Sequence, residues 1–186
     1  KSGIKELIVI AQDTTKYGVD IYGKARLAEL LNELCKIDGI KWIRFLYAYP
    51  ETITDELINV VKNNDKICNY FDIPIQHISD KVLKRMNRKY TKEQYLALVE
   101  KMKARIPGIV LSTDIIVGFP GETEEDFEDT LDVVSKVHFE QVYMFIYSRR
   151  VGTPADKMEN QVPDEVKHER FDRLKKLAES QIAGNN

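Results

Sequence analysis

Residues 109–147 decide the fold class, and they read IVLSTDIIVGFPGETEEDFEDTLDVVSKVHFEQVYMFIY. The stretch opens with an apolar, β-branched run over 109–117 and closes with a second such run over 141–147. Between them, Thr123-Glu124-Glu125-Asp126 offers a capping hydroxyl followed by acids, which is a common way for a helix to begin. A strand, a helix and a second strand in this order predict a right-handed βαβ unit with parallel strands.

The same alternation extends over the rest of the chain. Further strands are expected at 6–11, 42–47 and 70–75, and helices, with apolar residues three and four apart, at 22–34, 54–63, 79–86 and 91–105. The 186 residues suit one parallel α/β domain, expected over 1–180, with a short tail over 181–186. Whether such a sheet closes into a barrel or stays open, ligands bind at the carboxyl ends of its strands.

Polar residues follow every expected strand. The exits are Gln12-Asp13-Thr14-Thr15, Tyr49-Pro50-Glu51-Thr52, Pro74-Ile75-Gln76-His77, Gly118-Phe119-Pro120-Gly121-Glu122 and Tyr147-Ser148-Arg149-Arg150, with Ser112-Thr113-Asp114 inside the fourth strand. Asp, Ser and Thr also cap helices and form turns, so Asp13, Thr14 and Ser148 have that simpler interpretation. Five polar exits at one edge nevertheless favour a ligand site there.

Several single residues at these exits have a specific interpretation. Gly118 and Gly121 lack the third glycine of a dinucleotide fingerprint and the lysine of a P-loop, so we expect Gly118 to let the backbone approach a flat ligand. His77 has no second ligand residue at metal spacing and is expected to be a polar residue of the pocket wall. Arg85 and Arg88 follow the third strand on a short helix, where the guanidinium of Arg88 is placed to pair with a ligand carboxylate.

The composition limits where the protein is expected to be located and which partners it is expected to bind. The 28 Lys and Arg residues are interspersed with 30 Asp and Glu residues, so the net charge of −2 does not demand a nucleic acid. No apolar run reaches the roughly 18–20 residues of a membrane span, and the first residues lack the layout of a signal peptide, so we expect a cytoplasmic protein without a membrane partner. Cys35 and Cys68 are isolated in the sequence and are expected to be buried thiols.

Three motifs in order resemble the radical S-adenosylmethionine methylthiotransferase family. They are Gln12–Gly23, Tyr47-Ala48-Tyr49-Pro50 and Asp72–Asp80. In this front half the chain is similar to the members that add a methylthio group to an aspartate of a small-subunit ribosomal protein. The segments 83–91, 112–127 and 145–158 are shared across the family. The segment Gln161-Val162-Pro163-Asp164-Glu165 is at least as similar to the members that modify adenosine in tRNA as to those that modify the ribosomal protein.

The resemblance implies the partial (β/α)6 barrel of radical S-adenosylmethionine enzymes, here from its second strand to its sixth, with the first strand and the cluster loop missing. It implies S-adenosylmethionine as a cofactor and, in the full-length enzyme, a [4Fe–4S] cluster held by a Cys-x-x-x-Cys-x-x-Cys motif that neither Cys35 nor Cys68 can replace. A reductant such as flavodoxin or ferredoxin is implied as a partner. This chain alone is expected to be inactive and to bind no cluster.

The resemblance also implies a set of cofactor contacts. In the wider superfamily a strand-end Gln, an Arg twelve positions later and an Asp on the next strand often hold the cofactor, and Gln76, Arg88 and Asp114 stand at similar spacing. Arg88 suits the carboxylate of the cofactor, Gln76 and Asp114 suit its ribose hydroxyls, and the first exit suits its ammonium group. The expected cofactor contacts are Gln12, Asp13, Thr14, Gln76, Arg88, Asp114 and Gly118, with Gln12, Gln76 and Asp114 opening to one cleft. No catalytic side chain and no metal ligand is expected in this chain.

The acceptor is expected to be a small-subunit ribosomal protein, with tRNA as the alternative. The exits that resemble the ribosomal-protein members form the mouth of the site, whereas Gln161–Leu174 is expected to be a peripheral helix with its connecting loop. Two other classes of function remain open. One is a non-catalytic, cluster-less fragment that binds S-adenosylmethionine. The other is an ordinary (β/α) enzyme, which would need a Lys or a pair of acids at the strand ends.

Overall fold

The computed structural model describes residues 2–184 of the chain. These residues divide into two compact units. The first unit contains the chain up to Pro74 together with Ala97–Leu111, and the second contains Ile75–Leu96 and the chain from Ser112 onwards. The helix α5 (Lys92–Arg105) and the strand β4 (Val110–Val117) each run from one unit into the other.

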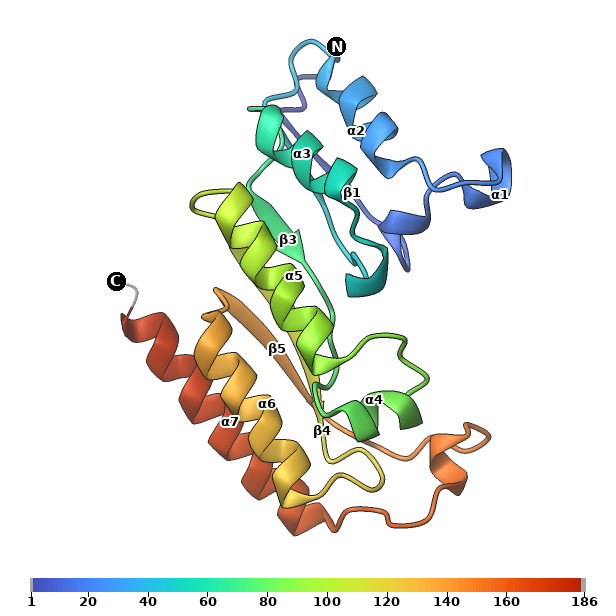
Figure 1. The fold of residues 1–186 in the computed structure, drawn as a ribbon, viewed down its shortest axis with the longest axis vertical. Helices are drawn as coiled ribbons and strands as arrows, with labels where there is room; N and C mark the ends of the chain where they lie inside the picture. Colours follow the sequence, from blue (N-terminus) through green and yellow to red (C-terminus); the bar gives the residue numbers. More distant parts are fainter. Residues whose placement is uncertain (1, 185–186) are drawn as a thin grey trace. The chain divides into compact units, whose positions relative to one another are not determined.

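The first unit is built on two parallel strands with two helices beside them. Strands β1 (Glu6–Val9) and β2 (Trp42–Phe45) pair in register from Glu6 opposite Trp42 to Val9 opposite Phe45. Helices α2 (Leu27–Cys35) and α3 (Asp55–Asn63) lie side by side in Figure 1, and α2 also contacts β2. Strand β3 (Tyr70–Asp72) adds Phe71, whose ring meets that of Phe45 edge to face at 5.2 Å. The core of the unit therefore forms where the apolar faces of these elements meet.

The helix expected over 22–34 begins later than its apolar pattern indicates. A separate turn of helix, α1 (Val19–Tyr22), ends at Gly23, which has a φ of 70° and lies in the left-handed region. Such a residue ends a helix, because the next backbone groups point away from the helix axis. The chain then begins a new helix at Leu27, so the expected start at Tyr22 was wrong.

The second unit contains the βαβ arrangement expected over 109–147. Strand β4 pairs in parallel with β5 (Gln141–Ile146), from Ser112 opposite Gln141 to Val117 opposite Ile146. Helix α6 (Glu124–Val137) connects them and begins with a capping box in which Thr123 and Asp126 bond to each other's backbone. The short helix α4 (Asp80–Arg85) and the start of α5 precede β4 in the chain.

Helix α7 (Asp164–Gly184) is part of the core of the second unit. It lies against both α6 and β5, as Figure 1 shows, and Leu174 on its inner side is fully buried. The expectation of a peripheral helix over 161–174 was therefore wrong. The helix also continues through residue 180, where the tail was expected to begin, and residues 185 and 186 of that tail lie outside the described part of the chain.

The parallel α/β class expected from the sequence is confirmed. The pairs β1–β2 and β4–β5 are parallel, and within residues 2–184 the strands do not close into a barrel. The carboxyl ends of β4 and β5 lie at the same edge of the second unit, because the two strands run in the same direction. That edge carries the candidate site.

Candidate functional site

A pocket of about 520 Å³ opens at the carboxyl ends of the strands in the second unit. Its polar lining residues are Gln76, Asp114, Ser148, Arg150 and Thr153, and the larger apolar ones are Ile116, Phe119, Phe145, Ile146 and Tyr147. The volume lies within the range of about 300–1,000 Å³ that small-molecule sites occupy, and the mixture of aromatic walls with a few polar groups is typical of such sites. The pocket therefore has the size and lining of a small-molecule site.

Main-chain hydrogen bonds bring Gln76 and Asp114 together. The amide N of Gln76 donates to the carbonyl O of Asp114 at 2.9 Å, and the amide N of Ile116 donates to the carbonyl O of Gln76 at 2.8 Å. Gln76 itself has a φ of 59°, in the left-handed region that side-chain-bearing residues seldom adopt. Such strained residues concentrate at functional sites, where the surrounding structure holds them.

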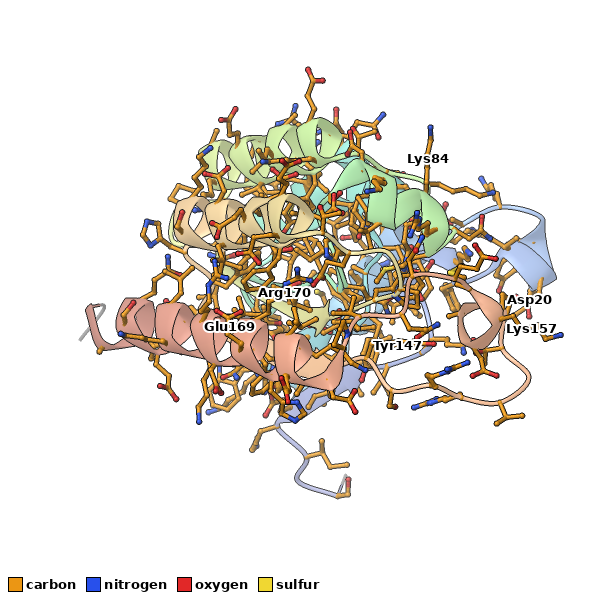
Figure 2. The ribbon with its side chains drawn as sticks, turned by 90° about the horizontal axis from the view of Figure 1, so that it is seen from below. Asp20, Lys84, Tyr147, Lys157, Glu169 and Arg170 are labelled. Atoms are coloured by element: carbon orange, nitrogen blue, oxygen red, sulfur yellow. The ribbon has the colours of Figure 1, made fainter. Side chains whose placement is uncertain are left out.

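Two aromatic rings form one wall of this pocket. Phe119 and Tyr147 meet edge to face, with ring centroids 5.4 Å apart and planes at 66°. The hydroxyl of Tyr147, which Figure 2 labels, is buried and has no hydrogen-bond partner among residues 2–184. A buried hydroxyl without a partner costs free energy, so this atom is a ready partner for a polar ligand group. The two rings thus present apolar surfaces at a steep angle to each other, and the Tyr147 hydroxyl is a polar atom beside them without a partner in the described residues.

The arginine that lines the pocket is Arg150, which was not among the expected cofactor contacts. Its neighbour Arg149 bonds instead to the carboxylate of Asp156, at 3.0 Å. Arg88, the residue expected to bind a carboxylate, is half-buried in the loop after α4, and its amide N donates to the carbonyl O of Leu83 at 2.8 Å. The signal for Arg150 was present, because it ends the fifth polar exit, but the exit alone does not show which of two adjacent arginines faces inward.

Gly118 packs against a side chain of α7. It has a φ of 79°, and a Cβ built there would lie 2.2 Å from Cγ of Lys167. The missing side chain of Gly118 therefore makes room for the stem of Lys167, whereas the adjacent Phe119 lines the pocket. A contact between Gly118 and a flat ligand stays a prediction.

His77 lies next to Gln76 but inside the protein. Its side chain is completely buried, and Nε2 lies 2.7 Å from Oε2 of Glu122, which is also buried. The expectation that His77 is a polar residue of the pocket wall was therefore wrong. A residue that follows a strand-end pocket residue points to the opposite side of the backbone, here into the core.

The first polar exit belongs to the other unit. Gln12 is exposed after β1, whereas Oδ1 of Asp13 accepts a hydrogen bond from the amide N of Thr15 at 3.1 Å. Thr14 is 1% exposed, and its hydroxyl donates to the carbonyl O of Leu46 at 2.8 Å. The capping interpretation of Asp13 is thus confirmed, and the side chain of Thr14 is used within the fold. The meeting of Gln12 with Gln76 and Asp114 at one cleft stays a prediction.

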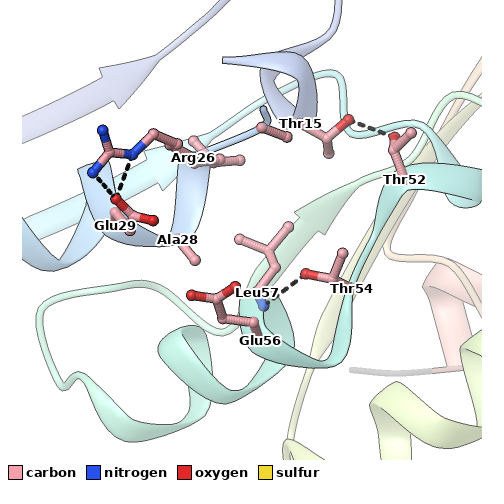
Figure 3. A pocket seen from close by; sticks show the side chains of 10 residues that line it. Thr15, Arg26, Ala28, Glu29, Thr52, Thr54, Glu56 and Leu57 are labelled. Carbon is pink, nitrogen blue, oxygen red and sulfur yellow. Dashed lines mark hydrogen bonds and ion pairs between the residues drawn. The ribbon is translucent and has the colours of Figure 1, made fainter. Parts of the chain in front are cut away.

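A second, smaller cavity lies in the first unit, between the exits of β1 and β2 (Figure 3). Its volume is about 60 Å³, far below that of a nucleoside site. The hydroxyls of Thr15 and Thr52 meet across it at 2.5 Å, and the hydroxyl of Thr54 accepts from the amide N of Leu57 at 3.2 Å. These bonds tie together the turns that follow the two strands, which is a structural role.

The described residues offer no metal centre. No group of three His, Cys, Asp or Glu residues in this part of the chain is placed to hold a metal ion. The chain's only cysteines, Cys35 and Cys68, are each partly exposed rather than buried as expected. Burial raises the pKa of the Cys35 thiol, although Lys66 opposes this shift, so the thiolate that a metal requires is disfavoured. An iron–sulfur cluster is held by three or four thiolates, and two cysteines are too few to supply them.

None of the helices in residues 2–184 has the length and apolar character of a membrane span.

Sequence comparison relates the chain to one enzyme superfamily. A family model described as "Radical SAM superfamily" matches residues 1–134. The chain is 58% identical to "Ribosomal protein uS12 methylthiotransferase RimO" of Alkaliphilus oremlandii over 179 residues, 96% of this chain and 41% of that protein. It is 58% identical to the protein of the same name in Clostridioides difficile over 174 residues, 94% of this chain and 39% of that protein. The chain thus spans about two fifths of the length of these curated relatives.

Solved structures with this fold are more distant in sequence. The radical S-adenosylmethionine methyltransferase TsrM from Kitasatospora setae, with cobalamin and a [4Fe–4S] cluster bound, matches with a TM-score of 0.63 at 18% identity, covering 83% of this chain and 30% of that one. The coproporphyrinogen III oxidase HemN from Escherichia coli matches with a TM-score of 0.59 at 12% identity, covering 95% and 52%. At these identities the likeness shows a common fold.

Proposed function

Since the chain belongs to the radical SAM superfamily, we propose that it is the cofactor-binding core of a methylthiotransferase that modifies ribosomal protein uS12. The observation that carries this proposal is the 58% identity to two curated proteins of that name over at least 94% of the chain. The second unit supports it with a pocket of nucleoside size at the strand ends, lined by the Gln and Asp that the family resemblance singles out. The activity is proposed for the protein that contains this core.

The pocket residues fit the nucleoside of S-adenosylmethionine. Gln76 and Asp114 would bind the ribose hydroxyls, because an amide and a carboxylate both accept hydrogen bonds from them. Phe119 and Tyr147 offer aromatic surface against which the adenine would pack, and the Tyr147 hydroxyl, which has no partner in the described residues, would bond to a ring nitrogen. Arg150 lines the pocket and is the better-placed partner for an anionic group, with Arg88 as the partner that the family resemblance implies.

The bound cofactor supplies the radical chemistry of this superfamily, and the residues of this chain bind and orient it. The two cysteines of the chain do not fit a cluster with three thiolate ligands, so we assign the [4Fe–4S] cluster no ligand in residues 1–186. The first polar exit, with Gln12 and Asp13, is proposed to face the ammonium group of the cofactor. A reductant such as flavodoxin or ferredoxin and a cytoplasmic location belong to the same proposal.

Binding measurements on pocket variants test the cofactor assignment. Titration of the chain with S-adenosylmethionine should give an affinity that falls about 5- to 10-fold in Gln76→Ala and about 10- to 100-fold in Asp114→Ala, because neutral and charged hydrogen bonds contribute about 1 and 1.5–3 kcal/mol. The matched control is Asp129→Asn, which removes a surface carboxylate that pairs with Lys92 in the same unit. Equal affinities for Asp114→Ala and Asp129→Asn would contradict the assignment.

The acceptor is tested in cells. Ribosomal proteins and total tRNA from a strain lacking the gene are compared with the parent by mass spectrometry. We expect the methylthio mass to disappear from uS12 and to remain on tRNA, and re-expression of the gene should restore it. Loss of the modification from tRNA with uS12 still modified would overturn the proposal in favour of a tRNA-adenosine methylthiotransferase.

A further inference from the structure

Three charged or titratable side chains meet in the interior of the second unit, and we refer to His77, Glu122 and Arg170 as the buried triad. They come from the exit after β3, the loop before α6 and the helix α7, where Figure 2 labels Arg170. His77 Nε2 lies 2.7 Å from Oε2 of Glu122, and Arg170 Nη1 lies 2.9 Å from its Oε1. His77 and Glu122 have fully buried side chains, and that of Arg170 is 7% exposed.

The hydrogen bonds around His77 determine which ring nitrogen carries its proton. The amide N of Ser79 donates to Nδ1 at 3.1 Å, so Nδ1 must present a lone pair. The proton of the neutral imidazole is therefore on Nε2, and it is donated to Glu122. Glu122 also accepts from Arg170 Nη1 and, at 3.2 Å, from the amide N of Gly118. All these contacts bring donors to the Glu122 carboxyl group, and the guanidinium of Arg170 is the charged one among them.

The buried triad is joined directly to the strained pocket residue. The amide N of His77 lies 2.6 Å from the carbonyl O of Ile75, which closes a tight turn around Gln76. The left-handed conformation of Gln76 costs about 1–2 kcal/mol for a residue with a side chain, so it persists only if its neighbours are held. On one side the chain is held by β4, and on the other by the imidazole of His77 bound to Glu122 and Ser79.

We propose that Glu122 and Arg170 are positioning residues that act through His77 to hold Gln76 in the conformation in which it lines the pocket. The role of the pocket residue as a cofactor contact rests on the function proposed above, whereas the holding of Gln76 does not. Arg170 Nη1 also donates to the carbonyl O of Glu122 at 3.1 Å, so the helix α7 fixes both the side chain and the backbone of Glu122. The affinity of the pocket for its ligand is thereby linked to a helix that does not line it.

The tautomer of His77 is the first test, and it needs no variant. The chain contains three histidines, so the imidazole nitrogens of ¹⁵N-labelled protein can be assigned by two-bond proton–nitrogen correlation spectra. At neutral pH we expect one histidine with a proton on Nε2 and an unprotonated Nδ1, and this histidine should be His77 by comparison with His77→Gln. A proton on Nδ1 of His77, with or without one on Nε2, would overturn the proposal.

Amide exchange in three variants of α7 tests the link to Gln76. Arg170→Gln should speed hydrogen exchange of the amides around Gln76 by at least about 10-fold, and Arg170→Lys, which keeps one charged donor to Glu122, should retain much of the protection. The matched control is Arg173→Gln on the same helix, where the guanidinium pairs with Glu124, Glu128 and Glu169 at the surface. Exchange around Gln76 that is equally fast in Arg170→Gln and Arg173→Gln would refute the positioning role.

Titration of the same proteins with S-adenosylmethionine separates the two proposals. We expect an affinity at least 10-fold lower in Arg170→Gln than in the parent chain, a partial recovery in Arg170→Lys and no change in Arg173→Gln. If the parent chain does not bind S-adenosylmethionine, the cofactor assignment fails, and the exchange data alone decide whether the triad holds Gln76. If Arg170→Gln does not fold, the comparison of Arg170→Lys with Arg173→Gln and the tautomer of His77 decide it.

Discussion

The replacement of Gly118 by alanine tests whether α7 packs on the end of β4 as closely as the structure indicates. The new methyl group would lie 2.2 Å from Cγ, 2.6 Å from Cδ and 3.1 Å from Cβ of Lys167. Lys167 cannot easily move aside, because it is buried and its Nζ bonds to the carbonyl O of Tyr147 at 3.2 Å. The left-handed backbone of Gly118 adds about 1–2 kcal/mol, and overpacking adds about 1–3 kcal/mol. Gly118→Ala should therefore lower the free energy of unfolding of the second unit by about 2–5 kcal/mol.

Gly152→Ala is the matched control. Gly152 has a φ of 89°, but a Cβ built there meets no atom within 4 Å, so only the backbone cost of about 1–2 kcal/mol remains. The double variant Gly118→Ala, Lys167→Ala should recover part of the steric cost, since the long stem that meets the new methyl group is gone. This recovery would appear as a coupling free energy in a double-mutant cycle.

The assay must report on the second unit. The single tryptophan, Trp42, lies in β2 of the first unit, so its fluorescence is a poor probe of this change. Urea-dependent hydrogen exchange of the α7 amides, read by mass spectrometry, follows the second unit directly. If Gly118→Ala costs no more than Gly152→Ala, the close packing of Lys167 over Gly118 is refuted.

Three further outcomes follow from named contacts. Thr123→Ala should cost about 1 kcal/mol of stability in urea unfolding, because it removes the hydroxyl half of the capping box of α6, and a change within error would contradict that role. Burial opposes ionisation of Asp126, but hydrogen bonds from Ser79 and Thr123 and the charge of Lys81 leave its pKa below the ordinary value. The contribution of Asp126 to the free energy of unfolding should thus be complete above a pH of about 4 and fall as the pH drops through the lowered pKa. Unfolding midpoints measured over a pH series should show this fall in the parent chain and not in Asp126→Asn. Burial raises the pKa of the Cys35 thiol, so iodoacetamide should label Cys35 more slowly at pH 7.5 than a free cysteine, as measured by mass spectrometry, and faster labelling would contradict this assignment.

Much of the fold could be predicted because the relevant signals are local. The apolar runs and caps around β4, α6 and β5 lie within about forty residues, and the structure reproduces the expected βαβ unit almost to the residue. The start of α2 was misplaced because Gly23 breaks a pattern that apolar spacing alone continues. Gln76 was expected at the exit of one strand and Asp114 inside the next, and both line one pocket because Gln76 forms a parallel bridge to Ile115, the neighbour of Asp114.

The buried triad could not be predicted, and the reason is the composition of α7. The buried positions of this helix are Lys167, Arg170, Leu174 and Ala178, which follow one another three or four residues apart as an inward face requires. Half of that face is charged, so the spacing of apolar residues does not indicate a buried face. The helix was therefore expected at the periphery. The acceptor of Arg170 is Glu122, 48 residues earlier in the chain, and no local spacing connects them. Only a fold that brings the loop before α6 under α7 makes these charges partners. A helix whose buried face is half charged thereby reaches His77, the neighbour of the strained pocket residue, through Glu122.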